Sequence, residues 1–186
     1  MAEPSAEAPL AGAFVHVLTV SVGVAPGVRE YRSGDAVAAR LAALGAEVSR
    51  STVADVVVAI AEAIGAAGSR SALVVTTGGT GLTPRDVTPQ AMRIILAYEI
   101  PGIAEAMRAA GRAITPLADL SRGLAGVVGR SLVINLPGSP KGALESLAAA
   151  EPVLAHALET LAGPLDHDAA RQGPGVGYDR PEESPR

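Results

Sequence analysis

The sequence predicts a three-layer α/β/α fold with a mostly parallel central sheet. Short apolar, β-branched runs alternate with segments whose apolar residues recur at helical spacing, and the connections between them are short. Alternation of this kind places helices on both faces of a parallel sheet. At 186 residues, the chain suffices for one well-filled domain and is too short for two ordinary ones.

The composition narrows the class of protein. Hydrophobic residues make up 48% of the chain but aromatic residues only 2%, so the core must consist of Ala, Val, Leu and Ile. The net charge of −4 and the lack of a basic stripe argue against a nucleic-acid partner. No apolar run approaches the roughly 20 residues that span a membrane, and the acidic, proline-bearing start is unlike a secretory signal. With no cysteine, the chain is expected to be cytoplasmic.

The first half is expected to begin with a disordered tail at residues 1–12, followed by the domain at 13–163. A strand is predicted at 14–20. Ser33 is predicted as the N-cap of a helix over 34–44. A second strand at 46–53 leads to a helix ending near 67, and Asp55 at its start is predicted as its N-cap.

The most informative stretch runs from Leu73 to Gln90. A buried strand at 73–77 is followed at once by three glycines within four residues, which let the backbone turn tightly and leave its N–H groups open to a ligand. Thr88 is predicted as the N-cap of a helix from Pro89 to Tyr98. A strand, a glycine loop and a helix start in this order predict an oxyanion cradle, usually for phosphate.

The second half continues with a helix over 103–110. Residues 113–130 are harder to assign, because their glycines argue against a long helix and leave short strands open. A strand at 131–135 enters the segment Leu136–Lys141, where Ser139 and Pro140 repeat the cap pattern of Thr88 and Pro89. One helix to about Ala150, another from Pro152 to near Gly163, and a disordered tail at 164–186 complete the prediction.

Three loops are expected along one edge of the sheet, because ligands of parallel sheets bind outside the carboxyl ends of the strands. They cover residues 21–33, 77–88 and 135–139, and each leads into a helix start, which suits a ligand with several phosphates. Asp86 lies beside this site. A carboxylate next to phosphates is explained by a Mg²⁺ held between them. Alternatively, Asp86 pairs with Arg85 or Arg93, or bonds loop amides.

Three blocks carry a family resemblance. Thr77–Gly81 with Arg85–Pro89, then Glu99–Gly102 with Glu105–Arg108, and finally Asn135–Lys141 closely resemble the molybdopterin-binding proteins of molybdenum cofactor synthesis. This family includes molybdopterin adenylyltransferases of the Mog type and the related MoaB proteins. The resemblance covers about residues 14–161.

The resemblance implies a MogA-like fold and the Mg²⁺- and ATP-dependent adenylylation of molybdopterin, with release of pyrophosphate. It implies catalytic and metal-binding roles for Asp86 and Asp55. The expected phosphate and nucleotide contacts are Ser21, Ser33, Thr77, Gly78, Gly79, Thr80 and Gly81. The expected molybdopterin contacts are Glu99, Pro137, Gly138, Ser139 and the only lysine, Lys141. A helix-end salt bridge is the alternative for Glu99. A homotrimer is expected, with a molybdenum insertion enzyme as a further partner.

The chain also departs from the family pattern. Val22, Tyr31–Arg32 and Val56 stand where these enzymes carry acidic residues, and Gln90 replaces a frequent Glu. The missing acids favour a second hypothesis, a molybdopterin-binding protein of the MoaB type without catalysis. A third hypothesis is a nucleotide pyrophosphatase of the competence-damage type, which shares the fold but usually carries paired acids where Arg85–Asp86 stand.

Overall fold

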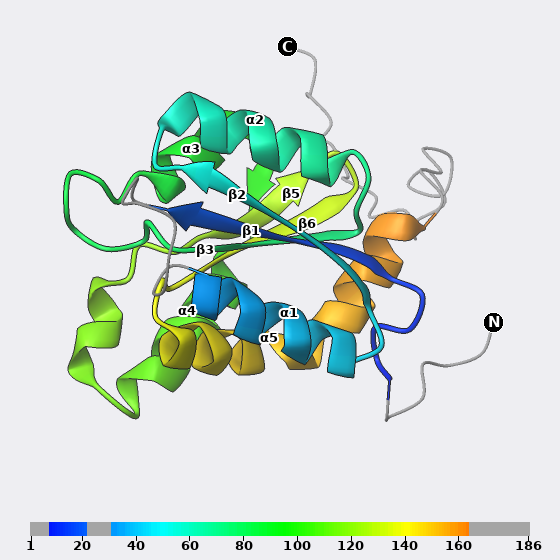
Figure 1. The fold of residues 1–186 in the computed structure, drawn as a ribbon. Coiled ribbons are helices and arrows are strands. Elements are labelled where there is room, and N and C mark those ends of the chain that lie inside the picture. The colour runs from blue at the N-terminus through cyan, green and yellow to red at the C-terminus, as the bar shows by residue number, and fades with distance from the viewer. Residues whose placement is uncertain (1–7, 22–30, 164–186) are drawn as a thin grey trace, which may run out of the picture.

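A six-stranded sheet forms the middle layer of the computed structural model, which describes residues 8–21 and 31–163 (Figure 1). The strand order is β2-β1-β3-β6-β5-β4. The first four strands run parallel, whereas β5 is antiparallel to both β6 and β4. The predicted mostly parallel sheet is therefore confirmed. The strands are β1 (Phe14–Ser21), β2 (Glu47–Ala54), β3 (Leu73–Thr77), β4 (Tyr98–Glu99), β5 (Ala125–Val128) and β6 (Ser131–Leu136).

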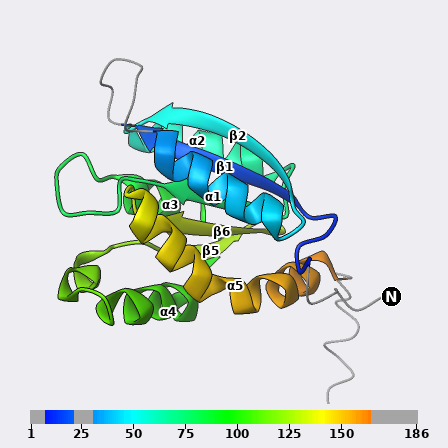
Figure 2. The same ribbon diagram turned by 60° about the horizontal axis from the view of Figure 1, so that its bottom comes forward.

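Helices cover both faces of the sheet, as predicted. One layer contains α2 and α3, and the opposite layer contains α1, α4 and α5 (Figures 1 and 2). The helices are α1 (Tyr31–Ala43), α2 (Val57–Gly68), α3 (Thr88–Ile95), α4 (Pro101–Arg112) and α5 (Pro140–Ala162), with a short 3₁₀ helix η1 (Pro116–Leu120).

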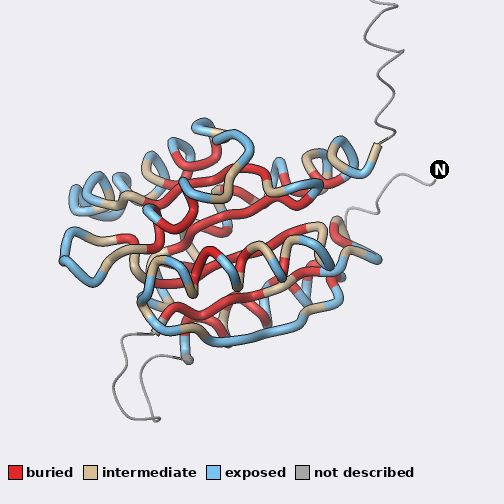
Figure 3. The backbone as a smooth tube through the Cα atoms, turned by 90° about the horizontal axis from the view of Figure 1, so that it is seen from above, coloured by how far each residue is buried: buried red, intermediate tan, exposed pale blue. Residues whose placement is uncertain are grey.

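Two apolar clusters, one on each face, hold the layers together. In β1, Val15 and Val17 join the cluster beneath α1 and α5, whereas Leu18 and Val20 join the cluster beneath α2 and α3. Successive strand residues point to opposite faces, so a strand covered on both sides must be apolar throughout. All five residues of β3 are buried. Figure 3 shows buried backbone through the middle of the domain and exposed backbone mostly at its periphery. Burial at about 25 cal/mol per Å² of apolar surface is the main stabilising contribution here.

Several predicted boundaries are wrong. The first helix begins at Tyr31, so Ser33 lies inside its first turn rather than capping it. The helix predicted to reach Tyr98 ends at Ile95, because Ala97 and Ile100 donate backbone hydrogen bonds to β5 and thereby create β4. The two helices predicted around Pro152 are one helix of 23 residues. Proline removes only one helical hydrogen bond, and apolar residues on both sides of it are buried.

Residues 8–12, predicted to belong to a disordered tail, pack against the domain. Leu10 is 2% exposed, and its N–H donates to the carbonyl of Leu44 at 2.9 Å. Packing therefore begins before residue 13. Residues 1–7, 164–186 and most of the predicted loop at 21–33, including Val22, lie outside the described residues. Among the described helices, none is long and apolar enough to cross a membrane.

Candidate functional site: a glycine loop at the carboxyl edge

The loop after β3 can form only with glycine at two positions. Gly78 and Gly79 have φ angles of +97° and +66°, a region that other residues rarely adopt. A Cβ on Gly78 would lie 2.7 Å from the carbonyl oxygen of Val20, and one on Gly79 would lie 2.2 Å from Oγ1 of Thr88. The loop thus lies directly against β1 and the start of α3.

Thr88 fixes this loop rather than capping the helix. Its hydroxyl donates to the carbonyl of Gly78 at 2.9 Å, and its N–H donates to the carbonyl of Gly79 at 3.2 Å. The side chain is fully buried, the N-cap position belongs to Val87, and no side chain caps α3. The predicted N-cap role of Thr88 is wrong, because its hydroxyl already serves the loop.

A cavity of about 690 Å³ opens along this loop. It brings together the ends of β1 and β3, the first turn of α1 and the start of α5. The lining residues are Val20, Arg32, Ser33, Thr77, Gly78, Gly79, Thr80, Gly81, Asp86, Pro137, Gly138, Ser139 and Pro140. Among the predicted site residues, those of the glycine loop and Pro137–Ser139 are therefore neighbours. We call this cavity the loop cleft.

The loop cleft presents hydrogen-bond donors. No other described residue accepts a hydrogen bond from the N–H of Gly79 or Thr80. Ser139 caps α5 as predicted, accepting from the N–H of Gly142 at 3.2 Å, and Pro140 follows at the first helical position. The starts of α1 and α5 both face the cleft, and helix starts favour anions. The start of α3 does not add a further anion site, because Thr88 is buried and its hydroxyl and N–H already donate to the glycine loop.

Asp86 supplies the only carboxylate among the described residues that line the cleft. Its Oδ2 accepts hydrogen bonds from the Thr83 N–H at 2.9 Å and the Thr83 hydroxyl at 2.6 Å. Partial burial acts to raise its pKa. The bonds from Thr83, a bond from the Gly81 N–H and the charge of Arg122 outweigh burial, so the pKa of Asp86 lies below its ordinary value. Asp86 therefore bonds loop amides, as the alternative hypothesis predicted, and it also lines the cleft.

This donor set suits a Mg²⁺ shared with a ligand. Mg²⁺ is commonly held by one or two carboxylates together with substrate phosphates and water, rather than by an all-protein cage. One ionised carboxylate beside loop amides that are unbonded within the described residues matches that pattern. In the described part of the chain, no group of three or more His, Cys, Asp or Glu residues could hold a metal ion by itself.

Other predicted site residues lie elsewhere. Asp55 follows the end of β2 but does not line the cleft, and Val56 rather than Asp55 occupies the N-cap of α2. Glu99 on the edge strand β4 pairs with Arg93 at 3.3 Å, which is the salt-bridge alternative. Lys141 is exposed, with its Nζ 3.7 Å from Glu145. Ser33, by contrast, lines the cleft. It is buried and donates to the Thr77 hydroxyl at 3.2 Å, so it also supports the end of β3.

Two arginines at the site were not predicted from the sequence. Arg32 lines the cleft at the start of α1. Arg122 donates through Nε to the carbonyl of Gly81 at 2.7 Å and through Nη2 to the carbonyl of Asp86. Neither stands in a glycine-rich motif, and Arg122 is 41 residues from Gly81 in sequence, so local spacing carried no signal for it.

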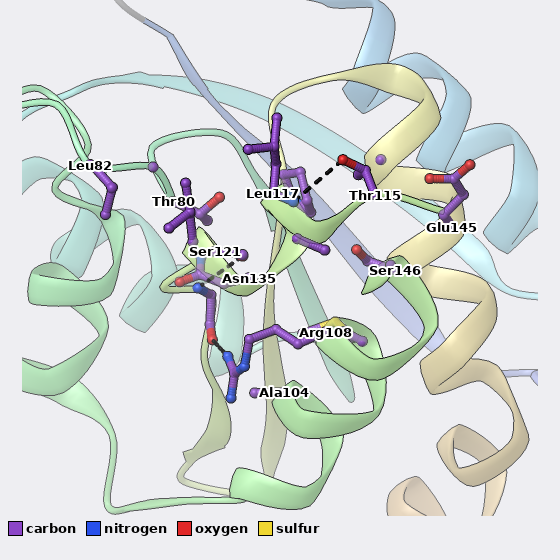
Figure 4. Close-up of a pocket in the computed structure, with 18 residues that line it drawn as sticks. Thr80, Leu82, Ala104, Arg108, Thr115, Leu117, Ser121, Asn135, Glu145 and Ser146 are labelled. Carbon is purple, nitrogen blue, oxygen red and sulfur yellow. Dashed lines mark hydrogen bonds between the residues drawn. The ribbon is translucent and has the colours of Figure 1, made fainter. Parts of the chain in front are cut away.

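A second cavity of about 480 Å³ adjoins the first, with Thr80, Gly81 and Pro137 lining both. Its walls come from α4, η1 and α5 (Figure 4). Apolar side chains such as Leu82, Met107 and Leu117 form much of its lining, and Arg108 donates to the carbonyl of Gly123 at 3.2 Å. A donor-lined loop next to an apolar recess is a shape that can accommodate a ligand with both an anionic group and a ring system.

The fold and this site define an α/β protein with a donor-lined cleft at the carboxyl edge of its sheet, the edge at which proteins of this class bind their ligands. A family model described as "probable molybdopterin binding domain" matches residues 16–156, and the chain belongs to that family. The predicted family is confirmed.

Known proteins agree with this assignment. The molybdopterin biosynthesis enzyme MoaB of Thermus thermophilus is 46% identical, with a TM-score of 0.75 over 82% of this chain and 98% of that one. The molybdenum cofactor biosynthesis bifunctional protein of Synechococcus elongatus is 43% identical over 164 residues, 87% of this chain and 51% of that protein. A molybdopterin adenylyltransferase of Helicobacter pylori is 44% identical over 91 residues, 49% of this chain and 52% of that enzyme. The chain thus spans about half the length of these two curated relatives.

Proposed function

We propose that this protein adenylylates molybdopterin, using ATP and Mg²⁺ and releasing pyrophosphate. The observation that carries the proposal is the juxtaposition of an ionised carboxylate with two loop amides that no other described residue bonds, between two helix starts, in one cleft. The matched family and the adenylyltransferase name of the Helicobacter relative support it. The chain would act in molybdenum cofactor synthesis.

The proposed reaction joins two phosphates. A phosphate oxygen of molybdopterin attacks the α-phosphorus of ATP, a new P–O bond forms, and the bond from that phosphorus to pyrophosphate breaks. The protein needs to supply position and charge rather than a covalent intermediate. Mg²⁺ held by Asp86 would neutralise charge on the phosphates. We retain Asp55 as a proposed second ligand, which would have to approach together with the nucleotide.

The chain's own groups have distinct proposed tasks. The N–H groups of Gly79 and Thr80 would bind phosphate oxygens of the nucleotide, with Thr77, Gly78, Gly81, Ser33 and Ser21 completing that side of the cleft. Pro137, Gly138, Ser139 and Lys141 would bind molybdopterin at the start of α5, and Arg32 would add positive charge. Glu99 would contact the ligand only after leaving Arg93, so it is the weakest member of this set.

A transfer assay tests the proposal. Purified protein is mixed with molybdopterin, ATP and Mg²⁺, and adenylyl-molybdopterin is sought by mass spectrometry. Formation of the adduct, and its disappearance when Mg²⁺ is chelated, is the expected result. Tight binding of molybdopterin by folded protein, with no adduct over many binding lifetimes, would exclude the enzyme and leave the binding protein.

The second candidate is a non-catalytic molybdopterin-binding protein of the MoaB type. One observation favours it specifically: Asp86 is the single carboxylate lining the cleft within the described residues. In this case the cleft would hold and deliver molybdopterin, and the departures at Tyr31 and Val56 would explain why no transfer follows.

We also propose a homotrimer that passes its product to a molybdenum insertion enzyme. Exposed large apolar side chains support association, with Leu117, Ile94 and Leu82 at 69%, 66% and 64% exposure. Light scattering that returns three times the chain mass of 18.6 kDa is expected. A monomeric mass at micromolar concentration would exclude the trimer.

A further inference from the structure

Among the described residues, Arg122 alone ties the outer part of the glycine loop to the rest of the domain by hydrogen bonds. Its guanidinium donates to the carbonyls of Gly81 and Asp86, and its main-chain N–H donates to the carbonyl of Thr80 at 2.9 Å. Two of these bonds join Arg122, which lies between η1 and β5, to both ends of the turn at residues 81–86, and the third joins it to Thr80, directly before the turn.

The other hydrogen bonds of the turn are internal. They run from Thr83 to Asp86 Oδ2, from the Gly81 N–H to the Asp86 carboxylate, and from the Asp86 N–H to the Thr83 carbonyl. Within the described part of the chain, every hydrogen bond between residues 81–86 and the rest of the protein comes from Arg122. Residues 82–85 are all exposed, so apolar packing contributes little to their position.

The chemistry of arginine matches this task. The guanidinium is a rigid, planar fork of N–H donors, and here it spans two carbonyls at opposite ends of one turn. A lysine ammonium cannot present two donors in that fixed geometry. Arg122 lines neither the loop cleft nor the adjoining cavity. Its effect on a ligand must therefore pass through the loop.

We propose that Arg122 is a positioning residue, which holds Gly81 and Asp86 in the arrangement that binds the phosphates of the nucleotide and their Mg²⁺. The identity of that ligand rests on the proposed function, whereas the fixing of the loop does not. Removal of the guanidinium should free the turn while leaving the Pro137–Ser139 side of the cleft in place.

Hydrogen–deuterium exchange of the full chain tests the fixing of the loop. In Arg122→Gln, peptides covering residues 79–87 should exchange about tenfold faster, because two charge-assisted hydrogen bonds are lost. In Arg122→Lys, the exchange rate of these peptides should lie between that of Arg122→Gln and that of the wild type. Arg130→Gln is the matched control, since Arg130 also donates to backbone carbonyls, those of Leu161, Ala162 and Gly163, but far from this loop in sequence. Unchanged exchange at 79–87 in Arg122→Gln would overturn the proposal.

Calorimetric titration separates positioning from general stability. Magnesium ATP should bind Arg122→Gln about tenfold more weakly, molybdopterin less than threefold more weakly, and Arg122→Lys should recover part of the ATP affinity. Equal weakening of both ligands together with a large fall in melting temperature would mean that Arg122 is merely structural. If the wild type fails to transfer adenylate, the proposed function fails. Magnesium pyrophosphate then replaces ATP as the probe, and loop exchange still decides the role of Arg122.

Discussion

The hydroxyl of Thr88 occupies the space where a side chain on Gly79 would begin, 2.2 Å from the position of that Cβ. The same hydroxyl donates to the carbonyl of Gly78. The two residues therefore require each other: Thr88 closes the turn, and only glycine at position 79 leaves room for it. This contact is the reason that a loop with two left-handed residues can be both tight and reproducible.

Gly79→Val should destabilise the fold and abolish phosphate binding together. The valine would clash with Thr88 and would also be forced to a positive φ, at a cost of roughly 1–3 kcal/mol for the backbone alone. Chemical denaturation and calorimetry with magnesium ATP measure the two effects. Gly65→Ala in α2 is the control, because a Cβ there meets nothing within 4 Å. It should stabilise the protein by about 0.5–1 kcal/mol. Wild-type affinity in Gly79→Val would show that the loop is merely a turn.

Asp86→Asn should separate transfer from binding. The amide oxygen can still accept from Thr83, so stability and molybdopterin affinity should change little, whereas the charge that attracts Mg²⁺ is gone. Transfer from ATP should fall at least about a hundredfold, the usual consequence of losing one preorganised electrostatic contact of roughly 3 kcal/mol. Full activity in this variant would remove Asp86 from metal binding. A proportionate loss of all binding and stability would make it structural.

Ser139 caps α5 and is also a proposed molybdopterin contact, and different substitutions can separate these two roles. Ser139→Ala removes the cap of α5 and should cost about 1 kcal/mol of stability. Ser139→Asp keeps a capping oxygen but places negative charge at a proposed anion site, so stability should be kept while molybdopterin affinity falls at least about tenfold. Ser139→Asn, which caps without charge, is the control. Equal affinity of the Asp and Asn variants would place the phosphate elsewhere.

His16 should make stability depend on pH. Its ring bonds the hydroxyls of Ser49 and Ser51 at 2.8 and 2.7 Å. Burial, and then the charge of Arg70, lower its pKa below 6.5. The folded state therefore disfavours protonation of His16. Neutral His16 contributes its full stabilisation of the fold above about pH 6.5, and this stabilisation is lost as the pH falls through the lower folded pKa. His16→Gln should flatten the melting temperature between pH 7 and 5 relative to wild type, whereas replacing the exposed His156 should not. Parallel pH profiles for all three proteins would contradict this assignment.

The sequence predicted those parts of the molecule whose causes are local. The buried strand at Leu73–Thr77, the glycine turn and the cap at Ser139 each follow from neighbouring residues, and the structure confirms them. Long-range contacts explain the predictions that were wrong. Thr88 looks like a helix cap until the loop folds back onto it, and the edge strand β4 exists only because β5 lies beside it.

The candidate site likewise has a part that the sequence predicted and a part that it did not. The glycine loop, Asp86 and Pro137–Ser139 were predicted to meet because parallel strands end at one edge, and they line one cleft. The roles of these residues stay predictions. Arg122 escaped notice because its partners are carbonyl groups, which leave no trace in side-chain spacing. Asp55 was predicted as the N-cap of α2, and Val56 holds that position instead, whereas the metal-binding role of Asp55 stays a prediction.

The stoichiometry of pyrophosphate release is the most direct test of adenylylation. Wild-type protein is given ATP and Mg²⁺ with and without molybdopterin, and pyrophosphate and adenylyl-molybdopterin are measured in the same samples. We expect one pyrophosphate for each adduct, and none without molybdopterin. Pyrophosphate release without molybdopterin would instead show a nucleotide pyrophosphatase. Stable binding of molybdopterin with neither product would contradict the enzyme and establish the binding protein.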